Sequence, residues 1–268
     1  MINEDINSQL RAKYNPEGSQ LRQMQLRELA LLVEFDRICR KHNIDYWLDS
    51  GTLIGAIRHG GFIPWDDDID VCVLSKDRKK LRIAMKESLN QDYEYSEQGR
   101  NSKSTFTRLY DKKTSIKRKL KRQSVVVEDR LWVDVFFMQS GTLTAKKIIE
   151  NTYGKCVRRV WNTFNDGIFE HIIAMLIYPF SILLKVIIIF WCRIIYPDTM
   201  VSCYGNAFIT IRKKTEIFPL NEIEFEGHKF KAPCNIDSYL TRLFGNYMEI
   251  PTEDKIETHN ILEFNVDE

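Results

Sequence analysis

Four aspartates stand within five positions of this chain, at Asp66, Asp67, Asp68 and Asp70. The residues Ile69–Leu74 are mostly apolar and β-branched, which predicts a buried strand. Side chains alternate along a strand, so Asp68 and Asp70 should share one face. Neighbouring carboxylates repel each other unless a cation lies between them, and hard oxygen ligands suit Mg²⁺ or Mn²⁺. The pattern predicts a metal site that handles phosphate.

Two other interpretations of the acidic run compete with a metal site. An acidic run is often a solvated loop, but here the apolar residues 62–65 and a buried strand enclose it, where unpaired charge is costly. A calcium-binding loop would need glycine at its sixth position and glutamate at its twelfth. The chain has Val71 and Asp77 there, so the calcium loop is excluded.

A turn of small residues precedes the aspartates and could bind phosphate. Gly51 and Thr52 open a helix-like run that extends over Leu53–His59. The free N–H groups at a helix N-terminus are a natural phosphate cradle, and Thr52 adds a hydroxyl. Arg58 is a candidate phosphate contact near the end of this run.

Two further candidates have structural alternatives that the sequence leaves open. His59 is a candidate phosphate contact or a satisfied structural histidine. Trp65 is a candidate for stacking on a base or a choline cation, although a buried tryptophan beside Pro64 is the more common arrangement.

A third carboxylate, Asp134, stands alone inside the apolar strand-like run Leu131–Phe137. A lone charge in such a strand needs a partner, and a metal ion shared with Asp68 and Asp70 is the economical one. The alternative is an ion pair with an arginine or lysine. The shared ion requires the two strands to lie side by side.

The motifs at 51–59 and 62–70 resemble the signature of the LicD family, which includes bacterial phosphocholine transferases and is related to eukaryotic fukutin-type ribitol-phosphate transferases. Further blocks of the resemblance lie at 131–136, 216–227 and 239–259, so that it spans about 25–260. One departure is Phe136-Phe137-Met138-Gln139, where the family often has Phe-Pro-Leu-Asp, and no role of that later aspartate is carried over.

The resemblance implies a fold and an activity. The fold class is α/β (α+β), a nucleotidyltransferase-like mixed sheet flanked by helices, with an additional mostly helical apolar segment. The activity is transfer of phosphocholine, or a related phospho-alcohol, from a CDP-linked donor (CDP-choline favoured) to a hydroxyl of a cell-surface or lipid-linked glycan. Asp68, Asp70 and Asp134 would hold Mg²⁺ or Mn²⁺ at the donor pyrophosphate, and Asp134 would help deprotonate the acceptor. His259 matches the closing motif, without an assigned role.

Three alternatives to this function remain at the level of sequence. A CDP-ribitol or CDP-glycerol type phosphotransferase would use the same residues. A true nucleotidyltransferase would use a nucleoside triphosphate and release pyrophosphate. A catalytically silent membrane scaffold is disfavoured, because Asp68, Asp70 and Asp134 are intact.

Composition sets wider limits. The 268 residues carry a formal net charge of +2, which gives no nucleic-acid signal. The basic run 112–122 predicts mainly a solvated strand or loop, with a phosphorylated substrate or anionic membrane as the alternative. Six scattered cysteines and a polar N-terminus without a signal peptide pattern predict a cytosolic protein.

We expect one domain over 1–268, with a nucleotidyltransferase-like core at 19–140, a helical apolar insertion at 141–215, and a C-terminal part at 216–268. The expected helices are 19–42, 53–59, 77–89 and 148–161, with a short helix between Asn235 and Gly245. The expected strands are 44–48, 69–74, 106–110, 115–119 and 131–137, with a hairpin at 223–230.

The apolar run Ile172–Ile195 has the length to cross a bilayer. A single crossing would separate the aspartates from the last two blocks of the resemblance. We therefore expect a helix pair, broken near Pro179, that lies on a membrane interface or packs on the core. The predicted location is the cytoplasm, peripheral at the inner face of the cytoplasmic membrane.

Overall fold

The computed structural model describes residues 2–97, 107–119, 125–161, 168–203, 210–256, 258–259 and 261–266. Its α-helices are α1 (Glu4–Tyr14), α2 (Gln20–Lys41), α3 (Ser50–His59), α4 (Arg78–Ser88), α5 (Leu143–Ile149), α6 (Lys155–Trp161), α7 (Ile168–Ile195), α8 (Lys214–Ile217) and α9 (Ile236–Phe244). Its strands are β1 (Tyr46–Leu48), β2 (Ile69–Leu74), β3 (Tyr93–Ser96), β4 (Thr107–Asp111), β5 (Thr114–Lys119), β6 (Val126–Asp129), β7 (Trp132–Ser140), β8 (Thr199–Ser202), β9 (Arg212–Lys213), β10 (Asn221–Phe225), β11 (His228–Ala232) and β12 (Ile261–Val266). Short turns of helix lie at Ser75–Asp77 and Glu253–Lys255, and a π-helical turn lies at Glu150–Gly154.

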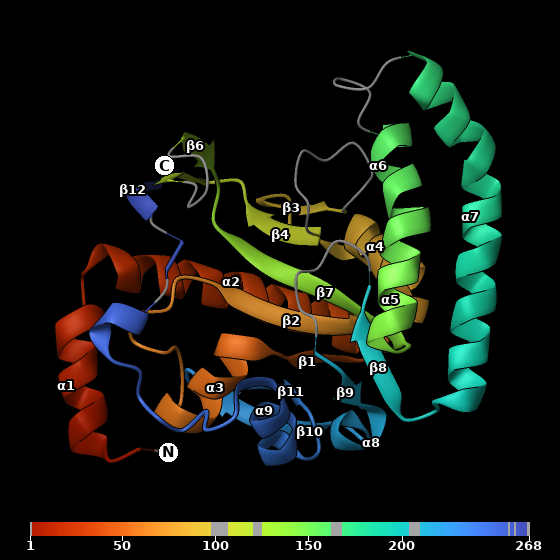
Figure 1. The fold of residues 1–268 in the computed structure, drawn as a ribbon. Helices are drawn as coiled ribbons and strands as arrows, with labels where there is room; N and C mark the ends of the chain where they lie inside the picture. The colour runs from red at the N-terminus through yellow and green to blue at the C-terminus, as the bar shows by residue number, and fades with distance from the viewer. Residues whose placement is uncertain are drawn as a thin grey trace.

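A mixed sheet forms the centre of the molecule, as predicted (Figure 1). Its strands follow the order β1-β2-β7-β4-β3, and β8 and β9 extend it from the second half of β7. Strands β2 and β7 are parallel neighbours, with Asp70 directly opposite Asp134. The side-by-side strands that the shared metal site requires are therefore present.

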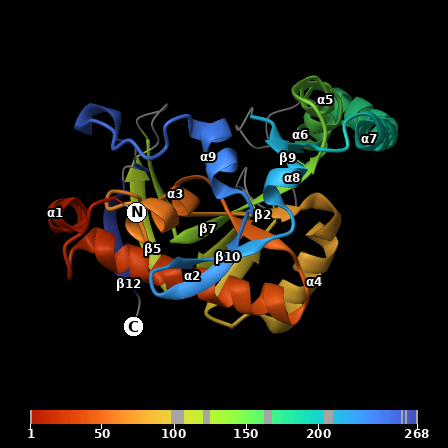
Figure 2. The ribbon, with the colours of Figure 1, turned by 90° about the horizontal axis from the view of Figure 1, so that it is seen from below.

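Helices cover both faces of this sheet. Figure 2 shows α2 and α4 on one face and α3 and α9 on the other. Helix α2 forms because Ser19 caps its first turn, accepting a hydrogen bond from the N–H of Arg22, and because its apolar residues recur at helical spacing. That apolar face, including Leu31, Leu32 and Phe35, is fully buried against the sheet. The predicted helix at 19–42 is confirmed.

The C-terminal part contains the predicted hairpin and helix. Strands β10 and β11 pair around Glu226 and Gly227, both with positive φ. Helix α9 begins after Asn235, whose side chain accepts from the N–H of Ser238, and ends at Gly245. A second sheet, β12-β5-β6, joins the C-terminal strand to the middle of the chain. The division into 19–140, 141–215 and 216–268 remains a prediction.

The expectation of a helix pair broken near Pro179 is wrong. Helix α7 runs without interruption from Ile168 to Ile195 with Pro179 inside it, and Figure 1 shows it bent in its upper part. Proline removes one helical N–H and crowds the preceding turn, which kinks a helix. The hydroxyl of Ser181 donates to the carbonyl of Tyr178 at 2.6 Å, beside the kink. Long apolar turns on both sides keep the helix continuous.

Candidate functional site

Three of the predicted residues converge at the start of two parallel strands. Asp68, Asp70 and Asp134 each place a carboxylate oxygen within 4.8 Å of the others. Strands β2 and β7 produce this convergence, because Asp70 and Asp134 are opposite each other and therefore on the same face. Asp70 and Asp134 are buried, while Asp68 is partly open to solvent. The predicted juxtaposition is confirmed, and metal binding stays a prediction.

The acidic cluster is electrostatically incomplete by itself. Burial, together with the charges of Asp68 and Asp134, raises the pKa of Asp70 well above its usual range. Burial raises the pKa of Asp68 to about 6, with His259 opposing the shift and Asp134 adding to it. Burial and Asp68 likewise raise the pKa of Asp66. A set of hard oxygen donors that repel one another in this way fits Mg²⁺ or Mn²⁺.

Asp134 pairs with an arginine and also lies in the acidic cluster. Its oxygens accept hydrogen bonds from Arg108 Nε at 2.7 Å and Trp132 Nε1 at 2.9 Å. The guanidinium of Arg108 also lies 4.1 Å from the centroid of the Trp132 ring. Asp134 therefore has an arginine partner and still reaches the cluster. Its suitability as a general base is weakened, because both oxygens already accept hydrogen bonds.

His259, which had no assigned role, closes the cluster from the C-terminal side. Its Nδ1 lies 2.9 Å from Asp67 Oδ1, its backbone N–H donates to Asp67 Oδ2, and its Nε2 lies 3.7 Å from Asp68 Oδ2. Burial disfavours the imidazolium, but the hydrogen bond that its ring donates to Asp67 and the charges of Asp68, Asp67 and Asp134 raise the pKa of His259 to about 9. His259 therefore supplies positive charge to the cluster.

The predicted phosphate cradle lies directly beside the carboxylates. The Thr52 hydroxyl oxygen accepts from the N–H of Asp70 at 2.8 Å. A Cβ on Gly51 would come within 2.6 Å of Asp66 Oδ2, so any larger residue there must displace the Asp66 carboxylate. Ser50 has a positive φ, and its buried hydroxyl has no hydrogen-bond partner among the described residues. Phosphate binding by Gly51 and Thr52 stays a prediction.

Arg58 and His59 are both used inside the protein. Arg58 Nη1 donates to the carbonyls of Tyr247 and Glu249 at 2.9 Å, and its Nε donates to His59 Nε2. His59 Nδ1 lies 2.7 Å from Asn7 Oδ1. Burial and the charge of Arg58 lower the pKa of His59 to about 3. This neutral, satisfied ring matches the structural alternative for His59.

Trp65 is also buried, with 7% of its surface exposed. Tyr14 and His59 pack edge-on against its ring, with centroids at 5.4 and 6.2 Å. The structural alternative therefore describes Trp65 better than a stacking surface does.

Two residues near the cluster were not foreseen. Arg108 lies in a strand that was predicted, but only the pairing of β4 with β7 brings it to Asp134. Glu28 is 1% exposed on α2, and its Oε2 has no hydrogen-bond partner within the described ranges. Burial, then the charges of Asp68 and Asp67, raise the pKa of Glu28 well above its usual range. The sequence held one signal for Glu28, a carboxylate at helical spacing from Met24 and Leu31.

The basic run is largely paired where it is described. Lys117 and Glu263 form an exposed ion pair, and Arg118 and Asp129 form a half-buried one. The exposed pair agrees with the solvated strand that was predicted; residues 120–122 of the run lie outside the described part.

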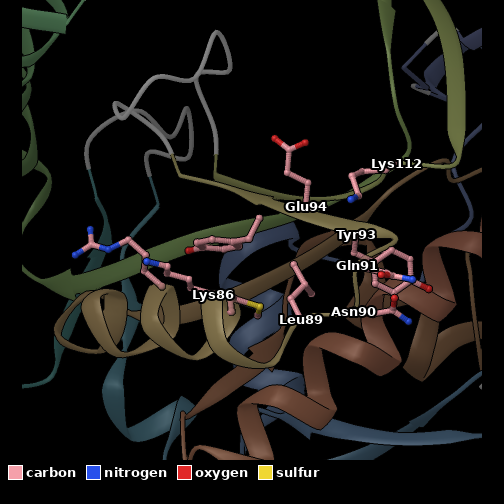
Figure 3. A pocket seen from close by; sticks show the side chains of 10 residues that line it. Lys86, Leu89, Asn90, Gln91, Tyr93, Glu94 and Lys112 are labelled. Atoms are coloured by element: carbon pink, nitrogen blue, oxygen red, sulfur yellow. The ribbon is translucent and has the colours of Figure 1, made fainter.

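A surface pocket of about 430 Å³ lies between α4 and β3, lined by residues that include Lys86, Leu89, Tyr93 and Lys112 (Figure 3). None of the predicted site residues lines it. The cluster of aspartates remains the candidate active site.

Comparison with known proteins shows which family the chain resembles. Residues 43–164 match the family model described as "LicD/FKTN/FKRP, nucleotidyltransferase domain". The lipopolysaccharide cholinephosphotransferase LicD of Haemophilus influenzae is 29% identical over 269 residues, which cover 91% of this chain and 97% of that protein. The human ribitol 5-phosphate transferase FKRP is 50% identical over 34 residues, 13% of this chain and 7% of that protein. The chain is therefore similar to the LicD family over residues 43–164, and to a lipopolysaccharide cholinephosphotransferase over nearly its whole length.

Proposed function

We propose that this protein is a Mg²⁺- or Mn²⁺-dependent phosphotransferase that moves phosphocholine from a CDP-linked donor to a hydroxyl of a cell-surface glycan. The observation that carries the proposal is the convergence of Asp68, Asp70 and Asp134 within 4.8 Å at the N-terminus of α3. Similarity to a lipopolysaccharide cholinephosphotransferase over nearly the whole chain supports phosphocholine and a glycan acceptor.

The residues of the cluster would have different roles in the reaction. Asp68, Asp70 and Asp134 would hold the ion, and Arg108 would keep Asp134 in place. A bound divalent cation would neutralise the charge that develops on the donor phosphates during in-line attack. The first amides of α3, at Gly51 and Thr52, would orient the donor phosphate.

A ribitol or glycerol phosphate donor is the second candidate. The short stretch of 50% identity to a ribitol 5-phosphate transferase favours it specifically. Both candidates release CMP from the donor, so they differ only in the alcohol that is transferred.

The proposed location is the cytoplasm, peripheral at the inner face of the cytoplasmic membrane. An acceptor glycan built on a lipid carrier would be within reach there. The exposed apolar surface of α7 supports this location.

The test is a screen of CDP-choline, CDP-ribitol and CDP-glycerol with glycan acceptors, in which CMP release is followed with and without Mg²⁺ or Mn²⁺. We expect CMP release that requires the metal and is greatest with CDP-choline. Asp70→Asn should reduce it at least about a thousandfold, because a charged ligand of the ion is lost. The variant should stay folded, since it removes a carboxylate that its neighbours repel.

Each other outcome is informative. Near-normal CMP release by Asp70→Asn would overturn the mechanism. Pyrophosphate release from a nucleoside triphosphate, with no CMP from any CDP-linked donor, would identify a nucleotidyltransferase instead.

A further inference from the structure

Helix α7 presents a continuous apolar stripe to solvent. The stripe, here the outer stripe, consists of residues at spacings of three, four and seven: Phe169, Leu176, Phe180, Leu183, Ile187, Phe190 and Ile194. Phe169 and Phe180 are more than 70% exposed, and the other five are between 44% and 66% exposed. Apolar patches of this length are rare on soluble monomers and mark a surface that contacts something else.

The opposite side of α7 is polar and faces the protein. Ser181 and Cys192 are buried there, and Tyr178 stacks on Tyr153 of the π-helical turn. The ammonium of Lys185 lies 4.1 Å from the centroid of the Tyr153 ring. These contacts fix the rotation of the helix, and the exposed outer stripe lies on the side away from them. Figure 1 shows α7 at the edge of the molecule.

Two ordinary explanations for a long apolar helix fail. A core helix would be mostly buried, whereas only 11% of the most apolar window of α7 is buried. A spanning helix would take the helices packed along it into the membrane as well. Those helices are α5 and α6, which carry the exposed charged residues Lys147, Lys155 and Arg159.

The chain's charge identifies the kind of surface. Residues 143–196 hold seven Lys and Arg against three Asp and Glu, a net charge of +4. The whole chain carries +2, so the remainder carries −2. Positive charge is therefore concentrated in residues 143–196, the part of the chain that includes the outer stripe. An apolar face beside basic residues is the pattern of a helix that lies in an anionic lipid interface.

We propose that α7 lies in the plane of an anionic lipid surface, with the outer stripe in the acyl region and the polar side kept on the protein. This names the contact surface for the peripheral location proposed above and rests on that location, but not on the phosphotransfer chemistry.

Vesicle sedimentation tests the proposal directly. The full chain should bind vesicles of equal parts phosphatidylglycerol and phosphatidylcholine, bind vesicles of phosphatidylcholine more weakly, and be released by alkaline carbonate. Leu176→Glu with Leu183→Glu should lower the partition coefficient about a hundredfold, since each buried leucine contributes roughly tenfold. The matched control is Leu26→Glu with Ile83→Glu, two residues each 44% exposed on α2 and α4, which should bind as the unchanged protein does.

Fluorescence gives a second measurement, which needs only a conservative substitution at an exposed position. Trp191 is 54% exposed on α7, whereas Trp47 and Trp132 are buried in the core. Vesicles of brominated lipid should quench the unchanged protein more than Trp191→Phe. Equal quenching of the two would overturn the proposed orientation.

Three outcomes would overturn the proposal itself. These are absence of vesicle binding, equal loss of binding in the control variant, and resistance of the bound protein to alkaline carbonate. The stripe could instead bind a second copy of the chain. In that case the unchanged protein would be a dimer that does not bind vesicles, and Leu176→Glu with Leu183→Glu would convert it to a monomer. The variant should release CMP normally with a soluble glycan acceptor, and Asp70→Asn should bind vesicles normally. Failure of either proposal is therefore distinguishable from failure of the other.

Discussion

Asp134 and Asp70 occupy equivalent places on adjacent strands, yet only Asp134 has an arginine partner among the described residues. Arg108 neutralises Asp134 and is itself held over Trp132. Asp70 has neighbours of its own sign, and its hydrogen bonds to Thr52 and Asp49 are made by its backbone. A bound cation is therefore needed mainly to neutralise the carboxylates of Asp70 and Asp68. This division predicts different responses to substitution on the two strands.

Arg108→Gln should leave Asp134 buried without its cation. Breaking a buried pair from one side costs about 3–5 kcal/mol, so the free energy of unfolding should fall by that order in metal-free buffer. Mg²⁺ should restore part of the loss, because the ion then supplies the missing charge. Urea denaturation with and without Mg²⁺ measures both effects.

The control for Arg108 is Arg118→Gln, since Arg118 also lies near the ring of Trp132. Arg118 lies 5.2 Å from the Trp132 ring and pairs with Asp129, which is more exposed than Asp134. We expect a loss nearer 1 kcal/mol and no added benefit from Mg²⁺. An equal gain from Mg²⁺ in both variants would contradict a special role for Arg108.

His59 predicts a pH dependence of stability. Its folded pKa of about 3 lies below the ordinary 6.5, so between these values the unfolded chain binds a proton that the folded protein does not. The stability that the neutral ring contributes is complete above about pH 6.5 and is lost as the pH falls, at up to about 1.4 kcal/mol per unit. His59→Gln removes this term. Between pH 7.5 and pH 5 the unchanged protein should therefore lose about 2 kcal/mol more than the variant in urea denaturation. Equal losses would show that His59 titrates normally.

At the scale of elements, the sequence predicted the helices and strands whose type is set by their own apolar pattern. Helix α2 and strands β2 and β7 have long apolar runs whose spacing or content decides their type, and each was predicted within a few residues. The short strands β3, β8 and β12 were missed, because pairing with distant strands stabilises them more than their own composition does. Arg108 was not predicted for the same reason, because only the pairing of β4 with β7 brings it to Asp134.

Helix α7 shows a different limit. Proline was expected to end a helix, but the flanking turns of α7 are apolar and long enough to continue through a kink. Helical spacing places Tyr178, Ser181, Lys185 and Cys192 near one face of this helix. Spacing alone does not show that this face meets Tyr153 and that the rest of the helix remains exposed.

The packing of α3 predicts a contrast between two glycines. A Cβ on Gly55 would collide with the backbone carbonyl of Gly61, which cannot move aside, so Gly55→Ala should lower stability by about 1–3 kcal/mol or more. A Cβ on Gly51 would meet only the end of the Asp66 side chain. Gly51→Ala should therefore cost less stability and mainly reduce activity, by displacing Asp66. Thermal unfolding and CMP release separate the two, and full activity of Gly51→Ala would show that the position of Asp66 is unimportant.

At the scale of the molecule, the site depends on both ends of the chain. His259 reaches Asp67 from the C-terminal segment, and Arg58 holds the carbonyls of Tyr247 and Glu249. Glu226 accepts from Arg22 and from the N–H of Phe62, just before the aspartates. These contacts support a single domain over 1–268, which remains a prediction.

A buried network at the C-terminal helix tests that prediction. The Tyr239 hydroxyl donates to Asp49 Oδ1 at 2.6 Å and accepts from Arg212 Nε at 2.7 Å, with all three residues at most 1% exposed. Tyr239→Phe would remove a hydrogen-bond partner from both charged groups, at roughly 1–3 kcal/mol each. We therefore expect a loss of about 3 kcal/mol or more. Tyr247→Phe, which removes an exposed bond to Asp237, should cost well under about 1 kcal/mol.

The form of the transition decides between one domain and two. If residues 216–268 complete a single domain, Tyr239→Phe should shift one unfolding transition that circular dichroism and tryptophan fluorescence report together. Asp49 connects the network to the site, because it directly precedes α3 and its N–H donates to the carbonyl of Asp70. The variant should therefore also weaken the stabilisation by Mg²⁺. Two separate transitions, with that stabilisation unchanged, would show that the C-terminal part folds apart from the site.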